Sequence, residues 1–184
     1  MTPETSRVQE LGGLAEDFTL PGVNGGQANL AALLAGKKGA VVVFWSGVCS
    51  HCIRYDAYLD RFAAQYPDLS LVVIASRSGE TPVQIRNTMA DRGIRFPIFH
   101  DQGGAVARQW STEQTPRAFL VDAGRVVLYR GAVDNFKYPG DPEYVAYLDN
   151  AISDFLAGKP VRRAETASFG CAIRSVYYTL PKHF

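Results

Sequence analysis

The run Ala40–Trp45, with the sequence AVVVFW, constrains the fold more than any other stretch of the chain. Its residues are all apolar and include consecutive valines, which indicates a strand that is buried on both faces. Strands of this kind are typical of sheets with parallel strands and helices on both sides. A second apolar run, LSLVVIAS over residues 69–76, predicts a neighbouring strand of the same type.

Helix and turn signals alternate with these two strands. Residues 117–131 predict a hairpin that turns at Ala123-Gly124. Five segments predict helices, namely 29–34, Cys49 to Tyr66, 81–93, a brief one over 104–111 and 142–158. The order βαβα, then a hairpin, then a helix predicts an α/β fold in which a central mixed sheet has helices on both faces.

Composition excludes several classes of function. The 184 residues suit one domain, and 47% hydrophobic with 20% charged residues is ordinary for a globular protein. A net charge of +1 gives no electrostatic reason to expect nucleic acid or an acidic membrane surface as a partner. No apolar run approaches the length of a membrane span. The N-terminus as written has no leader, which implies the cytoplasm, or an extracytoplasmic compartment if a leader has been trimmed.

Cys49 and Cys52 are three residues apart, at the point where the first buried strand is followed by a helix. The free N–H groups at the helix start stabilise a thiolate, so we expect a lowered pKa at Cys49. Cys52 lies one turn further on the same face, where it can resolve a mixed disulfide formed by Cys49. His51, when protonated, adds positive charge beside the pair and favours a more oxidising couple.

Two other interpretations of these cysteines stay open. In the first, Cys49 and Cys52 form a permanent structural disulfide or are packed as thiols in the core. In the second, they bind copper or zinc together with His51 and Cys171. Adjacent helical residues such as His51 and Cys52 point about 100° apart, which weakens the metal interpretation. A Cys-x-x-C pair at a strand–helix junction favours redox exchange.

Longer motifs carry a resemblance to a known family. The segments LAEDFTLPGVNGG, GKKGAVVVFWSGVCSHC, FPIFHD, TPRAFLVDAGRVVLYRG and YLDNAISDFLAGKP are similar to those of thiol-disulfide oxidoreductases in the thioredoxin superfamily. The likeness is greatest to the redoxin (alkyl hydroperoxide reductase/thiol-specific antioxidant) group, including bacterial extracytoplasmic reductases of the TlpA/ResA kind. It covers roughly residues 14–160 and implies a thioredoxin-like three-layer fold.

The resemblance assigns roles to individual residues. It implies that Cys49 is the nucleophile, that Cys52 is the resolving thiol, and that Trp45 is the aromatic residue ending the central strand, where core packing is the alternative role. Thr115-Pro116 matches a cis-proline loop that leaves the Thr115 backbone free to pair with an extended substrate chain. The implied partners are protein thiols or disulfides and a redox protein that donates or accepts electrons. The electrons reside in the dithiol, so no dissociable cofactor is expected.

Two departures from related patterns are informative. Val43 stands where thioredoxin has a buried Asp that accepts the proton of the resolving cysteine, and Glu80 matches an acidic residue of the TlpA/ResA branch. Glu80 then either exchanges a proton with Cys52 or is a charge placed before a helix. Ser46 fits the Pro-x-x-x-Thr/Ser-x-x-Cys loop of peroxiredoxins, but a valine replaces its proline, so peroxide reduction is an alternative activity that the sequence disfavours.

The sequence divides into a polar arm over residues 1–13, a redoxin domain over 14–160 and a C-terminal extension over 161–184 that carries Cys171. Cys171 has two interpretations. It anchors the extension as a small buried residue, or it is a third redox thiol that reaches Cys49 or Cys52. Tyr177 and Tyr178 are expected to pin the extension or to bury it in a homodimer.

Overall fold

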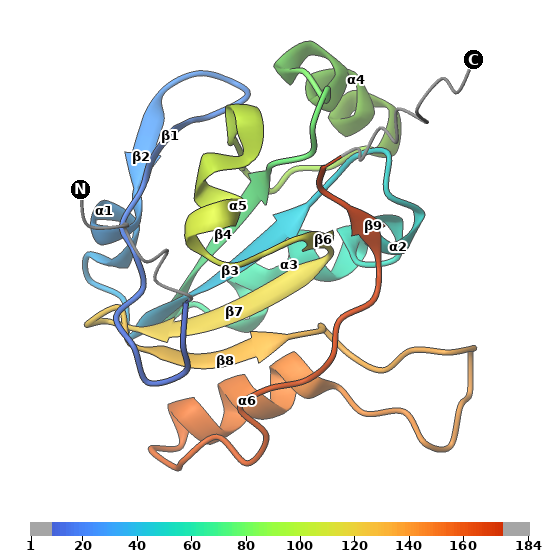
Figure 1. The fold of residues 1–184 in the computed structure, drawn as a ribbon. Helices are drawn as coiled ribbons and strands as arrows, with labels where there is room; N and C mark the ends of the chain where they lie inside the picture. Colours follow the sequence, from blue (N-terminus) through green and yellow to red (C-terminus); the bar gives the residue numbers. More distant parts are fainter. Residues whose placement is uncertain (1–8, 175–184) are drawn as a thin grey trace, which may run out of the picture.

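The computed structural model describes residues 9–174, so Tyr177 and Tyr178 lie outside the described residues. A five-stranded sheet in the order β5-β4-β3-β7-β8 forms the centre of the molecule (Figure 1). Its strands are β3 (Gly39–Trp45), β4 (Leu69–Ala75), β5 (Ile98–His100), β7 (Arg117–Asp122) and β8 (Val127–Gly131). β3, β4 and β5 are parallel, and β7 and β8 run antiparallel to their neighbours, as the sequence predicts.

The helices and the short strands complete the architecture. The helical segments are α1 (Leu30–Leu34), α2 (Ser50–Ile53), α3 (Asp56–Gln65), α4 (Pro82–Arg92), η1 (Gln102–Gly104), α5 (Ala105–Gln109) and α6 (Tyr147–Leu156). Two small antiparallel sheets pair β1 (Thr19–Pro21) with β2 (Gln27–Asn29), and β6 (Gln114–Thr115) with β9 (Cys171–Ala172). The predicted α/β fold with helices on both faces of a mixed sheet is confirmed.

β3 is buried along its whole length and divides the interior into two layers. Val41, Val43 and Trp45 face one hydrophobic core, and Ala40, Val42 and Phe44 face the other, as the period of a strand requires. The first core packs under α3, α4 and α6, and the second under α1 and α5. Each residue of β3 therefore meets a packed helical layer, which explains why polar residues are missing from this run.

α4 begins and ends as its sequence indicates. The Thr81 hydroxyl accepts from the Gln84 backbone N–H, and the Gln84 side chain accepts from the Thr81 backbone N–H, which forms a capping box. Pro82 occupies the first turn, and Gly93 ends the helix with φ of 66°, a conformation that favours glycine.

Two helix predictions need correction. The segment from Cys49 to Tyr66 is divided into α2 and α3, because the N–H groups of Cys52 and Tyr55 bond to carbonyls three residues back and tighten the turn. The helix predicted over 142–158 begins only at Tyr147. Asn135 explains the delay, because its side chain accepts from the Val145 N–H and donates to the Glu143 carbonyl. These bonds tie the segment to the preceding loop.

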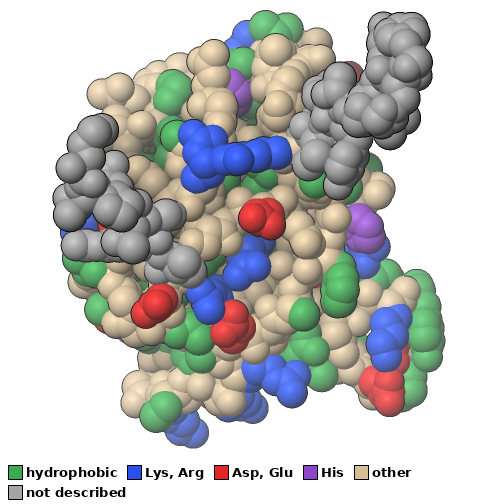
Figure 2. All heavy atoms as spheres, in the orientation of Figure 1, with side chains coloured by type: hydrophobic (Ala, Val, Ile, Leu, Met, Phe, Trp, Pro, Cys, Tyr) green, Lys and Arg blue, Asp and Glu red, His purple; other side chains and the backbone are tan. Residues whose placement is uncertain are grey.

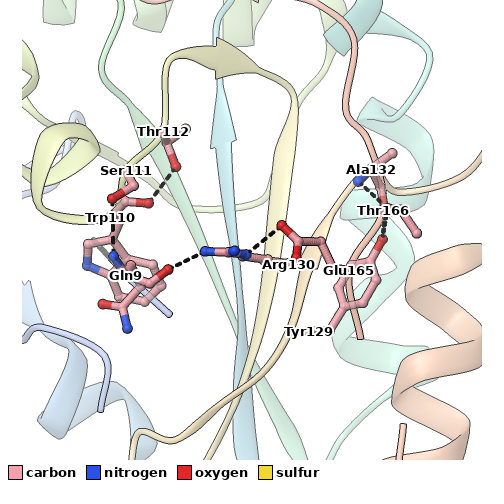
Figure 3. Close-up of polar contacts among 9 residues, drawn as sticks. All are labelled: Gln9, Trp110, Ser111, Thr112, Tyr129, Arg130, Ala132, Glu165 and Thr166. Atoms are coloured by element: carbon pink, nitrogen blue, oxygen red, sulfur yellow. Dashed lines mark hydrogen bonds and ion pairs between the residues drawn. The ribbon is translucent and has the colours of Figure 1, made fainter. Parts of the chain in front are cut away.

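The chain beyond α6 returns along the edge of the sheet. Arg130 of β8 bonds the carboxylate of Glu165 at 2.9 Å and also donates to the Gln9 carbonyl (Figure 3). The hydroxyl groups of Tyr129 and Thr166 are 2.7 Å apart. These contacts join both ends of the described chain to β8 and direct the C-terminal extension toward β6.

We expect Thr81→Ala to lower the free energy of unfolding by about 1 kcal/mol, because it leaves an N–H group of α4 without its cap. The measurement is a urea unfolding curve followed by circular dichroism. Val83→Ala is the matched control, since Val83 lies in the same first turn and its side chain is 56% exposed. Equal stability of Thr81→Ala and the wild type would contradict the capping assignment.

Candidate active site

Cys49 and Cys52 lie where the carboxyl end of β3 meets α2. Cys49 is the N-cap residue of α2. Its backbone N–H donates to the Ser46 carbonyl at 3.2 Å, so the strand passes into the helix through one tight turn. Both sulfurs are 0% exposed, and all three cysteines of the chain are free thiols in this structure. The site is therefore a covered dithiol.

The loop between β6 and β7 faces this dithiol. Its Thr115-Pro116 peptide bond is cis, in agreement with the sequence motif. The Cys49 sulfur lies 3.3 Å from the Thr115 carbonyl oxygen, to which the protonated thiol donates a hydrogen bond. Residues from two strands far apart in the sequence thus meet at one sulfur.

The two thiols have opposite electrostatic environments. A hydrogen bond from the Cys52 thiol is the largest influence on Cys49 and, together with weaker bonds from Cys171 and Thr115, outweighs burial and lowers the pKa of Cys49 to about 4. Burial and the neighbouring Cys49 thiolate raise the pKa of Cys52 well above its usual range. Cys49 is therefore the thiolate and Cys52 the thiol at neutral pH, which is the polarity that the sequence predicts.

Local hydrogen bonds are the causes that accompany this polarity. α2 has only four residues, and hydrogen bonds from neighbouring thiols account for the low pKa of Cys49. His51 is exposed and lines a neighbouring cavity of about 500 Å³ together with Arg54, Pro116 and Phe136. On the face drawn in Figure 2, charges of both signs are mixed among apolar side chains.

A partly buried network supports the turn before Cys49. Trp45 is 0% exposed and donates through its indole N–H to Asp56, whose carboxylate pairs with Arg92 at 2.8 Å. Arg92 in turn donates to the Gly47 carbonyl at 2.9 Å and lies over the Trp45 ring. Trp45 thus packs in the core below the dithiol, and Asp56 and Arg92 are supporting residues that no sequence pattern indicated.

Glu80 contacts the same turn through its carboxylate. Its carboxylate oxygens accept from the Ser46 hydroxyl at 2.8 Å and from the Gly47 N–H at 2.7 Å. A Cβ atom at residue 47 would lie 2.8 Å from the Glu80 carboxylate, so glycine permits this approach. The Ser46 backbone also bonds the Cys52 sulfur, which links Glu80 to the resolving thiol through one residue.

Cys171 lies at the same site, although it is far from the other cysteines in sequence. β9 pairs with β6 so that Cys171 stands opposite Thr115. The expected free backbone at Thr115 is therefore already paired within the chain, which sequence patterns could not show. Burial, and hydrogen bonding to Cys49 next, raise the pKa of Cys171.

Within residues 9–174, no set of three or more His, Cys, Asp or Glu side chains is arranged to hold a metal ion. None of the helices in the same range is long and apolar enough to cross a membrane.

Comparison with known proteins agrees with this geometry. The thiol-disulfide oxidoreductase ResA of Bacillus thuringiensis subsp. konkukian is 25% identical over 119 residues, which cover 64% of this chain and 68% of that protein. A hypothetical protein from Sinorhizobium meliloti 1021 has a similar structure, with a TM-score of 0.79, 29% identity and coverage of 89% and 93% of the two chains. A thiol:disulfide interchange protein DsbE from Chlorobium tepidum shares the fold at 23% identity, with a TM-score of 0.66 and coverage of 80% and 98%.

The fold and the Cys-x-x-C pair define the class of protein as a thioredoxin-like thiol-disulfide oxidoreductase. The model of the Redoxin family matches residues 10–148, so the chain belongs to the Redoxin family.

We expect the absorbance of the reduced protein at 240 nm to rise with pH at a midpoint of about 4, as Cys49 becomes a thiolate. Cys52→Ala removes the hydrogen bond that lowers this pKa most, so its midpoint should move upward. Cys49→Ser is the control and should lose the transition. A wild-type midpoint at the value of an ordinary thiol, about 8.5, would contradict the assignment.

Proposed function

We propose that this chain exchanges electrons with thiols and disulfides of other proteins through Cys49 and Cys52, without a dissociable cofactor. The observation that carries the proposal is the opposite shift in the pKa values of two adjacent thiols. The Cys49 thiolate attacks one sulfur of a substrate disulfide, and the other substrate sulfur leaves as a thiolate. Cys52 then loses its proton and attacks Cys49, which releases the second substrate thiolate and leaves a Cys49–Cys52 disulfide.

The remaining predicted site residues have supporting roles in this proposal. Thr115, the last residue of β6, and Pro116 lie beside Cys49, and an extended substrate segment pairs there in place of β9. His51 is exposed next to that edge and, when protonated, raises the redox potential. A second redox protein returns the dithiol to its starting state.

We expect Cys49→Ser to abolish insulin reduction in the presence of dithiothreitol, because it removes the nucleophile. Cys52→Ser/Cys171→Ser, which lacks both neighbouring thiols, should stop after the first step and accumulate a mixed disulfide on Cys49, which mass spectrometry detects. Oxidation of Cys49 by micromolar peroxide that outpaces disulfide exchange would favour a peroxidase instead. Copper or zinc retained stoichiometrically on a chelating column, without insulin reduction, would favour metal binding.

Glu80 is proposed as the group that receives the Cys52 proton during the second step. Its contact with Ser46, whose backbone bonds the Cys52 sulfur, supports this role. No acidic side chain at position 43 competes with Glu80 for the Cys52 proton, because that residue is the buried, apolar Val43.

We expect Glu80→Gln to change the pH dependence of the exchange rate, because an amide cannot accept the proton. Ser46→Ala is the matched control: it removes a hydrogen bond to Glu80 and keeps the carboxylate. The rate is measured from pH 5 to 9 with the same disulfide substrate. An unchanged profile in Glu80→Gln, with unchanged stability, would assign Glu80 a purely structural role.

A further inference from the structure

The C-terminal extension occupies the strand edge beside Cys49. β9 pairs antiparallel with β6, with Cys171 opposite Thr115 and Ala172 opposite Gln114, and Figure 1 shows β9 beside β6 and α2. The Thr115 hydroxyl also approaches the Cys171 carbonyl, at 3.5 Å. An extended chain paired at this edge is what the proposed function requires of a substrate.

Residues after Cys171 anchor the segment. Ile173 is only 2% exposed and belongs to the second hydrophobic core. Its N–H donates to the Glu113 carbonyl at 2.9 Å, and its carbonyl accepts from the Ser78 N–H at 2.8 Å. Arg77 donates to the Ala172 carbonyl at 3.1 Å. The segment is thus held on both sides by buried packing and by backbone hydrogen bonds.

Gly170 makes the close approach to β6 feasible. A Cβ atom at this position would lie 1.8 Å from the Thr115 carbonyl oxygen, which no real side chain can occupy. Any other residue at position 170 would displace the segment from the edge. Glycine at position 170 therefore allows Cys171 to pair with Thr115 of β6.

The docked segment brings the Cys171 sulfur to the dithiol. Cys49 is 0% exposed, and Cys171 packs against the hydrophobic core that contains Cys49 and Cys52. Hydrogen bonding from Cys171 is among the causes that lower the pKa of Cys49. A sulfur opposite Thr115 thus stands beside the nucleophile, where the sulfur of a substrate cysteine has to lie for exchange.

We propose that the segment of residues 170–173 is an intramolecular substrate, and that Cys171 is a third redox thiol that exchanges with Cys49. The proposal rests on the dithiol exchange described under the proposed function. External substrates have to displace this segment before they can reach Cys49. The substrates that fit best have a glycine immediately before the reactive cysteine.

The exchange conserves atoms and electrons. In the oxidised protein, the Cys171 thiolate attacks the Cys49 sulfur of the Cys49–Cys52 disulfide, so that a Cys49–Cys171 bond forms and Cys52 leaves. The proton that Cys171 gave up ends on Cys52, whose environment favours the thiol. A Cys49 held in a disulfide carries no charge, so one of the causes that raise the pKa of Cys171 is absent in this state.

The first test maps disulfides in Cys52→Ser after treatment with oxidised glutathione. Cys49 attacks glutathione disulfide and releases one glutathione, and Cys171 then attacks Cys49 and releases the second. Peptide mapping should find a Cys49–Cys171 disulfide, whereas Cys52→Ser/Cys171→Ser should keep glutathione on Cys49. Retention of glutathione in Cys52→Ser, with an alkylatable Cys171, would overturn the proposal.

The second test uses Gly170→Val, which prevents docking through the contact with Thr115. Alkylation of Cys49 by iodoacetamide should accelerate about tenfold, because the accessible state gains population. Ala167→Val is the matched control, since Ala167 is exposed. Equal alkylation rates in both variants would show that the segment does not cover Cys49.

These outcomes separate this inference from the proposed function. Insulin reduction that fails in the wild type while Cys49–Cys171 still forms in Cys52→Ser contradicts the proposed function alone. Normal insulin reduction without the Cys49–Cys171 disulfide contradicts the intramolecular substrate alone. The disulfide map also decides the question if Gly170→Val does not fold.

Discussion

The contact between the Cys49 sulfur and the Thr115 carbonyl is the interaction on which the site depends. It joins the end of β3 to the loop between β6 and β7, and it is possible only because β3 and β7 are neighbours in the sheet. The approach of these two segments also brings donor groups to the same sulfur. Cys52, Thr115 and Cys171 all reach one sulfur, and their hydrogen bonds stabilise its thiolate against the cost of burial.

Two sets of contacts hold the turn that carries Cys49. Trp45, Asp56 and Arg92 form one set, and Glu80 with Ser46 forms the other, and both converge on Gly47. A nucleophile held by groups that are themselves packed and hydrogen-bonded keeps its geometry between the steps of exchange. The C-terminal segment opposite this turn pairs with β6 through a strand of two residues.

Local rules made much of the fold predictable. The apolar run of β3, the capping residues of α4 and the turn of the β7–β8 hairpin each specify their own conformation, and the structure agrees. The late start of α6 depends on Asn135, a residue of another segment, and the division between α2 and α3 is set by local hydrogen bonds that periodicity does not encode. Periodicity locates an amphipathic segment better than it locates its ends.

The sequence by itself determined the class of chemistry, because a Cys-x-x-C pair after a doubly buried strand and a Thr-Pro motif are local features with local physical meaning. Only the tertiary structure decided which groups surround the dithiol. Glu80, Arg92 and Cys171 come to it from separate segments, brought there by sheet order and by the path of the C-terminal extension. Spatial proximity between distant segments follows from packing of the whole chain, so no pattern within one segment specifies it.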